Sequence, residues 1–196
     1  MSNQGTGILE RLAAASLETC LHRISAVSSG TWRLSGVSVS RGTLEDAVSR
    51  HTFKSRDAAA VYIHVKSGLP FTSLMFFDTA DIPHISKCFL ETSLAATAGI
   101  EQFDEVMLLE LGNIILNSVI NYLQNALRKS AIPSVPMLLK GDPAHITLGL
   151  GSYIAPGRSF RIITGAVTVR GHTRVSGGEV LAILPEELAA ELERAG

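Results

Sequence analysis

Residues 104–130 read DEVMLLELGNIILNSVINYLQNALRKS, a long apolar helical pattern with a line of polar side chains along one side. At about 100° per residue in an α-helix, these polar side chains share one arc roughly 80° wide. The arc holds one acid, four amides and one base: Glu110, Asn113, Asn117, Asn121, Gln124 and Arg128. Apolar side chains fill the opposite side: Leu111, Ile115, Leu116, Val119, Leu123, Ala126 and Leu127. The stretch therefore predicts one long helix whose apolar side is buried in the core.

The polar arc is unusual because it consists mainly of amides, whereas the wet side of an amphipathic helix usually carries Lys and Glu. An amide is short and uncharged, and it can donate and accept hydrogen bonds at the same time. Such a line suits the binding of a water molecule or of a partner's polar group better than it suits solubility.

The composition is that of a folded globular protein with a balanced charge. The chain has 196 residues, 46% of them hydrophobic and 18% charged, and a formal net charge of −1. This length can bury a sizeable core and fits one domain or two small fused halves. The balance of 17 basic and 18 acidic residues argues against a nucleic-acid surface, which needs a basic excess.

The two cysteines, Cys20 and Cys88, lie in apolar contexts without a C-x-x-C spacing, which predicts buried free thiols in a reducing compartment. The start of the chain lacks the basic-then-apolar pattern of a signal peptide. No apolar run is expected to reach the roughly 20 residues that span a bilayer. These observations predict a soluble cytoplasmic protein that is not bound to a membrane.

Periodicity predicts helices and strands along the whole chain. Helices are expected over Ile8–Val27, Asp81–Glu91, residues 104–129 and a final segment opened by Pro185. Strands are expected over Trp32–Ser40, Ala58–Val65, Phe71–Phe77, Val135–Leu139, Ile146–Ile154, Ser159–Arg170 and Glu179–Leu184. The turn Ala155-Pro156-Gly157 would join two of these strands as a hairpin, and the polar stretch Gly42–Lys54 fits no single element.

The order helix, strands, helix occurs twice, which predicts an internally duplicated α+β domain. We expect a single domain over residues 1–196 made of two repeats, about 8–95 and 101–196. A shift of 100 residues would place Glu10 on Glu110, Ala13 on Asn113 and Gly36 on Pro136. One repeat alone could hardly bury its sheet, so the repeats should share an antiparallel sheet and two long helices related by a pseudo-twofold axis.

The stretch ELGNIILN and the later Pro136 match the pattern E-x-x-N-x22-P with Glu110, Asn113 and Pro136. In this motif and in its duplicated frame, the chain resembles the CheC, CheX and FliY family of chemotaxis phosphatases. The family's pattern begins with Asp or Ser four residues before the Glu, where this chain has Val106. The first half lacks the Asn and the Pro, so the resemblance implies one site, in the second half.

The resemblance implies a phosphatase that acts on the aspartyl phosphate of a CheY-like response regulator. Asn113 would orient a water in line with phosphorus, Glu110 would pair with a Lys of the receiver domain, and Pro136 would be structural. The chain itself would hold no cofactor, because Mg²⁺ belongs to the receiver. On the same face, Asn117 and Asn121 are candidates for partner contacts.

Several alternatives remain open at this stage. The polar arc could be an exposed stripe without a catalytic role, or it could pack against the first half's helix. A non-catalytic module could bind a receiver domain, a flagellar switch protein or a CheD-type deamidase. An unrelated homodimer built through the long helices is a further alternative. The six histidines are scattered, and none is expected to pair with another histidine or with a nearby cysteine, so they predict no metal site.

Overall fold

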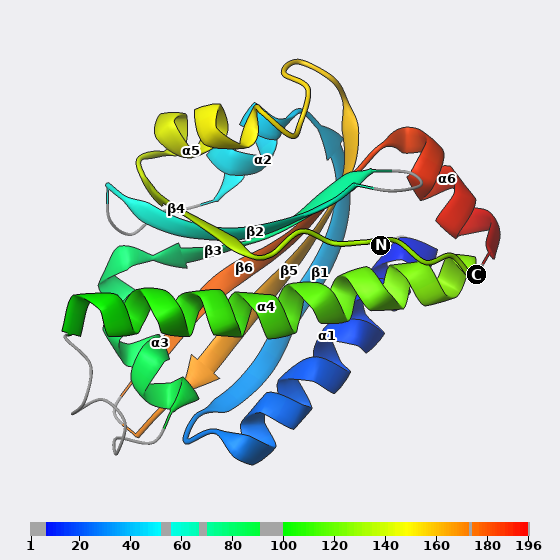
Figure 1. The fold of residues 1–196 in the computed structure, drawn as a ribbon. Coiled ribbons are helices and arrows are strands. Elements are labelled where there is room, and N and C mark those ends of the chain that lie inside the picture. The colour runs from blue at the N-terminus through cyan, green and yellow to red at the C-terminus, as the bar shows by residue number, and fades with distance from the viewer. Residues whose placement is uncertain (1–6, 52–55, 67–69, 91–99, 173, 196) are drawn as a thin grey trace, which may run out of the picture.

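A six-stranded antiparallel sheet lies at the centre of the structure (Figure 1). The computed structural model describes residues 7–51, 56–66, 70–90, 100–172 and 174–195. The strands are β1 (Thr31–Gly42), β2 (Ala58–Val65), β3 (Phe71–Asp78), β4 (Met137–Gly141), β5 (Phe160–Arg170) and β6 (Val175–Leu184). The helices are α1 (Ile8–Val27), α2 (Leu44–Arg50), α3 (Ile82–Phe89), α4 (Ile100–Leu127), α5 (Pro143–Leu150) and α6 (Glu186–Ala195), with a short 3-10 turn, η1, at Thr79–Asp81.

The helices lie in layers on the two faces of the sheet. The long helices α1 and α4 cross one face side by side, together with α3, while α2 and α5 cover part of the other face (Figure 1). Each face has its own buried cluster: the first is built around Leu17, Ile115 and Phe77, and the second around Leu44, Phe76 and Ile146. The predicted α+β fold with an antiparallel sheet and two long helices is thus confirmed.

The strand order in the sheet is β1-β5-β6-β3-β2-β4. Exchanging each strand with its counterpart in the other half (β1 with β4, β2 with β5, β3 with β6) gives the same order read from the opposite edge. The first strand of each half leaves its own half: β1 pairs with β5, and β4 pairs with β2. The helices α1 and α4 run antiparallel, since Ser16 contacts Ser118 while Cys20 contacts Ile114. This arrangement is the predicted pseudo-twofold, and it interlocks the halves. Residues 91–99, which hold the expected boundary near residue 95, lie outside the described residues.

From the long helix to the first short helix of each half, the correspondence is a shift of 99 residues and not the expected 100. This shift carries the cap residues Gly42 and Thr43 of α2 onto Gly141 and Asp142 of α5. It also carries the buried positions of α1 onto those of α4: Leu9, Ala13, Ser16, Leu17, Cys20, Leu21 and Ile24 onto Leu108, Gly112, Ile115, Leu116, Val119, Ile120 and Leu123. The pairing of Glu10, Ala13 and Gly36 with the motif residues was therefore wrong by one residue.

The predicted strand Ile146–Ile154 is wrong, because most of this stretch belongs to α5. Asp142 caps the helix by accepting a hydrogen bond from the His145 N–H at 2.8 Å, and Pro143 follows in a favoured first-turn position. Ile146 and Leu150, four residues apart, are the buried positions. A cap and a helical spacing therefore outweigh the β-branched composition, and Ala155-Pro156-Gly157 connects α5 to β5 instead of two strands.

In the polar stretch Gly42–Lys54, which fitted no single element, α2 begins after the capping box of Thr43 and Asp46.

By length and composition alone, Phe103–Leu127 of α4 would qualify as a membrane span, so the expectation that no apolar run reaches that length was wrong. The core helix of a soluble protein passes the same test. In this structure α4 packs on the sheet and is flanked by α1 and α3 (Figure 1).

Gly112 sets the distance between α4 and the sheet. A Cβ at this position would lie 2.5 Å from Cγ1 and 2.9 Å from Cβ of Val61, a fully buried residue of β2. No rotation of the valine side chain moves its Cβ away. The helix can approach β2 this closely only because residue 112 has no side chain.

We expect Gly112→Ala to lower the free energy of unfolding by about 2 kcal/mol, because overpacking at a buried contact outweighs the better helix propensity of alanine. Urea denaturation of the purified variant measures the change. Gly36→Ala is the matched control, since a Cβ at Gly36 meets nothing within 4 Å. Equal stability of the two variants would show that α4 does not depend on this close approach.

Candidate functional site

The candidate motif lies on α4, which is flanked by α1 and α3 (Figure 1). Leu111, Ile115 and Leu116 are buried, so the arc of the helix that carries the polar line turns away from the core. Glu110 is exposed and Asn113 is half-buried, one helical turn apart. Neither residue is buried against another helix of the chain, as one of the alternatives required.

Asn117, one turn beyond Asn113, is held against it. The Asn117 Nδ2 group donates to the backbone carbonyl oxygen of Asn113 at 3.0 Å and to its side-chain Oδ1 at 2.7 Å. The amide of Asn113 is thus partly occupied within its own helix. Sequence analysis placed the two residues on one face but did not foresee this bond, although amides at i and i+4 are known to interact.

A polar groove of about 500 Å³ runs between α1 and α4 beside these residues. Asn117 and Asn121 line it, so the structure brings both predicted partner-contact residues to one surface. From α1 it receives Ser16, Thr19, Cys20 and Arg23, and Arg23 is the only charged side chain among the described residues of its lining. The sequence did not reveal these residues of α1, because its pattern does not say which side of that helix faces α4.

The remaining polar positions of the arc diverge from the site. Gln124 and Arg128 line a different pocket, of about 340 Å³, near the C-terminal end of α4. Arg128 adopts a left-handed conformation with φ 52° where the helix ends. Of the original line, Asn117 and Asn121 line the groove, whereas Glu110 and Asn113 precede them on the same arc of α4 and are not part of its lining.

Pro136 directly precedes β4, and its structural role in setting how the chain leaves the long helix stays a prediction. The segment before it runs along β2, where the Ser134 N–H donates to the carbonyl oxygen of His64 at 2.8 Å. Val106, one turn before Glu110, is 56% exposed, so the position where the family has Asp or Ser does face solvent.

The cysteines and histidines of the described residues form no second candidate site. Both cysteines are free and buried, as predicted. The pKa of the Cys20 thiol is raised, because the effect of burial exceeds the lowering by the Ser118 hydrogen bond and the Arg23 charge. Burial also raises the pKa of the Cys88 thiol. The Nε2 atom of His84 lies 3.5 Å from the Cys88 sulfur, so the expectation that no histidine pairs with a nearby cysteine was wrong. Its Nδ1 atom lies 2.9 Å from Ser176 Oγ. Among the described residues no group of three or more His, Cys, Asp or Glu could hold a metal ion.

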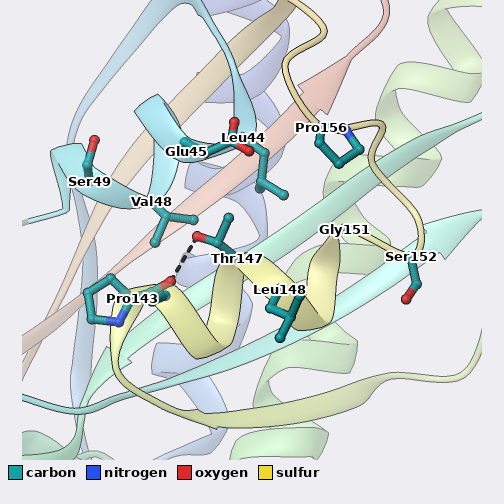
Figure 2. Close-up of a pocket in the computed structure, with 11 residues that line it drawn as sticks. Leu44, Glu45, Val48, Ser49, Pro143, Thr147, Leu148, Gly151, Ser152 and Pro156 are labelled. Carbon is teal, nitrogen blue, oxygen red and sulfur yellow. Dashed lines mark hydrogen bonds between the residues drawn. The ribbon is translucent and has the colours of Figure 1, made fainter.

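A separate cleft of about 730 Å³ lies on the opposite face of the sheet, between α2 and α5 (Figure 2). Its walls are mainly apolar and include Leu44, Val48 and Leu148, of which Leu148 is 78% exposed. Thr147 bonds back to the Pro143 carbonyl oxygen at 2.8 Å and so turns its hydroxyl into α5 (Figure 2). None of the predicted site residues lines this cleft.

No protein-family model matches the sequence, and no curated protein matches it either. The structure, by contrast, is similar to solved chemotaxis and flagellar switch proteins. FliY from Thermotoga maritima superimposes with a TM-score of 0.72 over 100% of this chain and 99% of its own, at 10% identity. The FliM middle domain from H. pylori gives 0.62 over 100% of both chains at 10% identity. CheX from Desulfovibrio desulfuricans gives 0.54 over 90% of this chain and 98% of its own, at 9% identity.

At such identities the likeness is one of fold, and it extends over the whole described frame of both halves. The similarity that the motif Glu110, Asn113 and Pro136 indicated is therefore matched by three-dimensional architecture. The chain has the fold of the CheC, CheX and FliY-like chemotaxis proteins.

Proposed function

We propose that this protein dephosphorylates the aspartyl phosphate of a CheY-like response regulator. The observation that carries the proposal is the position of Glu110 and Asn113, one turn apart on the outer side of α4, in a fold shared with FliY and CheX. Both side chains can reach a second molecule without any rearrangement of the core. By analogy with these folds, the protein works in the cytoplasm.

The reaction needs little from this chain beyond positioning, because an acyl phosphate is already reactive. In the proposed step, the oxygen of a water forms a bond to phosphorus while the bond from phosphorus to the aspartyl oxygen breaks. The electron pair of that bond leaves with the aspartyl carboxylate, and the protons of the water depart on inorganic phosphate. The receiver domain supplies Mg²⁺ and a Lys that neutralise the phosphoryl charge, and Asn113 holds the water in line.

Glu110 serves docking in this proposal. Its exposed carboxylate pairs with the receiver's Lys and so sets the register of α4 across the phosphorylated pocket. Asn121, one turn beyond Asn117, is left to contact the rim of the partner. Pro136 acts indirectly, through the path of the chain into β4.

A non-catalytic binding module is the second candidate, and a specific observation favours it. FliM middle domains have the same fold, and H. pylori FliM has been crystallised in complexes with FliG and with SpeE. Val106 replaces the polar residue of the phosphatase pattern at an exposed position. A module of this kind would bind a receiver domain, a flagellar switch protein or a CheD-type deamidase without turnover. A homodimer through the long helices would instead have to cover the outer side of α4.

Asn113→Ala should abolish the acceleration, lowering turnover on the order of 100-fold, because the water loses its orienting group. The measurement is the decay of an acyl-phosphorylated receiver domain, with Mg²⁺ present, in the presence of the wild type or the variant. Affinity for the receiver should change less than about threefold, because docking rests on Glu110. If the wild type leaves decay no faster than in the receiver alone, the phosphatase proposal fails and the binding module takes its place.

Glu110→Lys should weaken binding of the phosphorylated receiver roughly tenfold or more, since it replaces an ion pair by repulsion between like charges. Titration of the receiver loaded with Mg²⁺ and beryllofluoride, which imitates the phosphoryl group, measures the affinity. Glu45→Lys is the matched control, because it makes the same charge change on α2, on the opposite face of the sheet. Equal affinity of the two variants would refute the pairing of Glu110 with the partner.

A further inference from the structure

The contact between Asn113 and Asn117 fixes which end of the Asn113 amide faces outward. The atom of Asn117 that lies 3.0 Å from the Asn113 backbone oxygen must be the nitrogen, because a carbonyl oxygen can only accept. The same nitrogen lies 2.7 Å from a side-chain atom of Asn113. That atom must in turn be the oxygen Oδ1, since two NH₂ groups do not bond to each other. The Nδ2 group of Asn113 is therefore the end of the amide that Asn117 leaves available.

Few side chains could make this contact at position 117. The two hydrogens of one NH₂ group satisfy the backbone and the side-chain oxygen of Asn113 at once. A carboxylate has no hydrogen to give, and a hydroxyl has only one. The two bonds restrict the rotation of the Asn113 side chain before any partner arrives. They also draw electron density toward its oxygen, which makes its N–H groups better donors.

We propose that Asn117 is a positioning residue, which holds the Asn113 amide so that its NH₂ group points at the attacking water. This inference rests on the proposed phosphatase function and replaces the expected partner contact of Asn117. One N–H of Asn113 donates to one lone pair of the water oxygen. The other lone pair then stays free to attack phosphorus. An amide turned the other way would offer an acceptor and would hold the water by a proton.

The arrangement has an energetic consequence for turnover rather than for affinity. An amide that rotates freely spends part of its time with the wrong end outward, and it must be ordered in each encounter. Pre-organisation removes that cost from the reacting complex. Loss of Asn117 should therefore slow the step in which water attacks while leaving the docked complex intact.

The test compares Asn117→Ala and Asn117→Asp with the wild type in the decay of the acyl-phosphorylated receiver. We expect both variants to lose roughly tenfold in turnover at saturating receiver. For Asn117→Ala, affinity for the beryllofluoride-loaded receiver should stay within about twofold of wild type. The aspartate variant has nearly the same size, so its loss would come from the missing donor and not from a cavity. Gln124→Ala, which truncates a half-buried amide of α4 that lines the separate pocket near the end of the helix, is the control that should keep full turnover.

The outcomes separate this inference from the function on which it rests. A wild type without phosphatase activity would overturn both. An active wild type with an equally active Asn117→Ala variant would overturn the positioning role alone. Full turnover at saturation with weakened affinity would make Asn117 a partner contact instead. Side-chain amide signals in ¹⁵N-resolved NMR spectra test the bond without a partner: if Asn113→Ala leaves the Asn117 NH₂ signals unshifted, the contact is absent.

Discussion

The close approach of α4 to β2 at Gly112 is the contact on which the rest of the arrangement depends. A side chain there would collide with Val61, so the glycine both permits the contact and selects the side of the helix that makes it. Once residue 112 faces the sheet, the helical period decides where its neighbours point. Glu110 and Asn113 lie two residues before and one residue after the contact, and both are carried to the outer arc. A motif that looks chemical in sequence is thus held in place by a packing constraint in its middle.

The interlocked sheet explains why that constraint can be met. Val61 belongs to the first half and α4 to the second, and β2 is itself flanked by β3 of its own half and β4 of the other. Neither half could offer α4 a finished surface alone, because β1 and β4 have each crossed to the opposite hairpin. The polar groove has the same origin, since α1 supplies one wall and α4 the other. The candidate surface is therefore a product of both repeats, although its motif lies in one.

Periodicity in the sequence predicted the long helices, a strand at each of the six strand positions and the duplicated frame, because strong periodicity over many residues leaves few alternatives. It failed over Ile146–Ile154, where Thr, Ile and Leu imitate a strand while the capping Asp142 and Pro143 lie just outside the apolar run. The helical arc placed Glu110, Asn113, Asn117 and Asn121 on one face, because that placement depends on local geometry alone; their roles stay predictions. Periodicity could not find Thr19 or Arg23, because their place beside α4 is set by tertiary packing, nor the direction of the Asn113 amide, which depends on hydrogen bonds.

The shift of 99 residues also shows why the other long helix offers no equivalent surface. On α1 the positions of Glu110 and Asn113 fall to Arg11 and Ala14, and that of Gly112 to the buried Ala13. The packing position thus keeps a small residue in both halves, whereas the outward positions differ in charge and in hydrogen-bonding capacity. Burial requires a small residue at the packing position of either helix, but it places no demand on the outward positions. An acid and an amide on the outer side of α4 are therefore not explained by the fold, and the proposed binding of a partner would supply the reason that packing lacks.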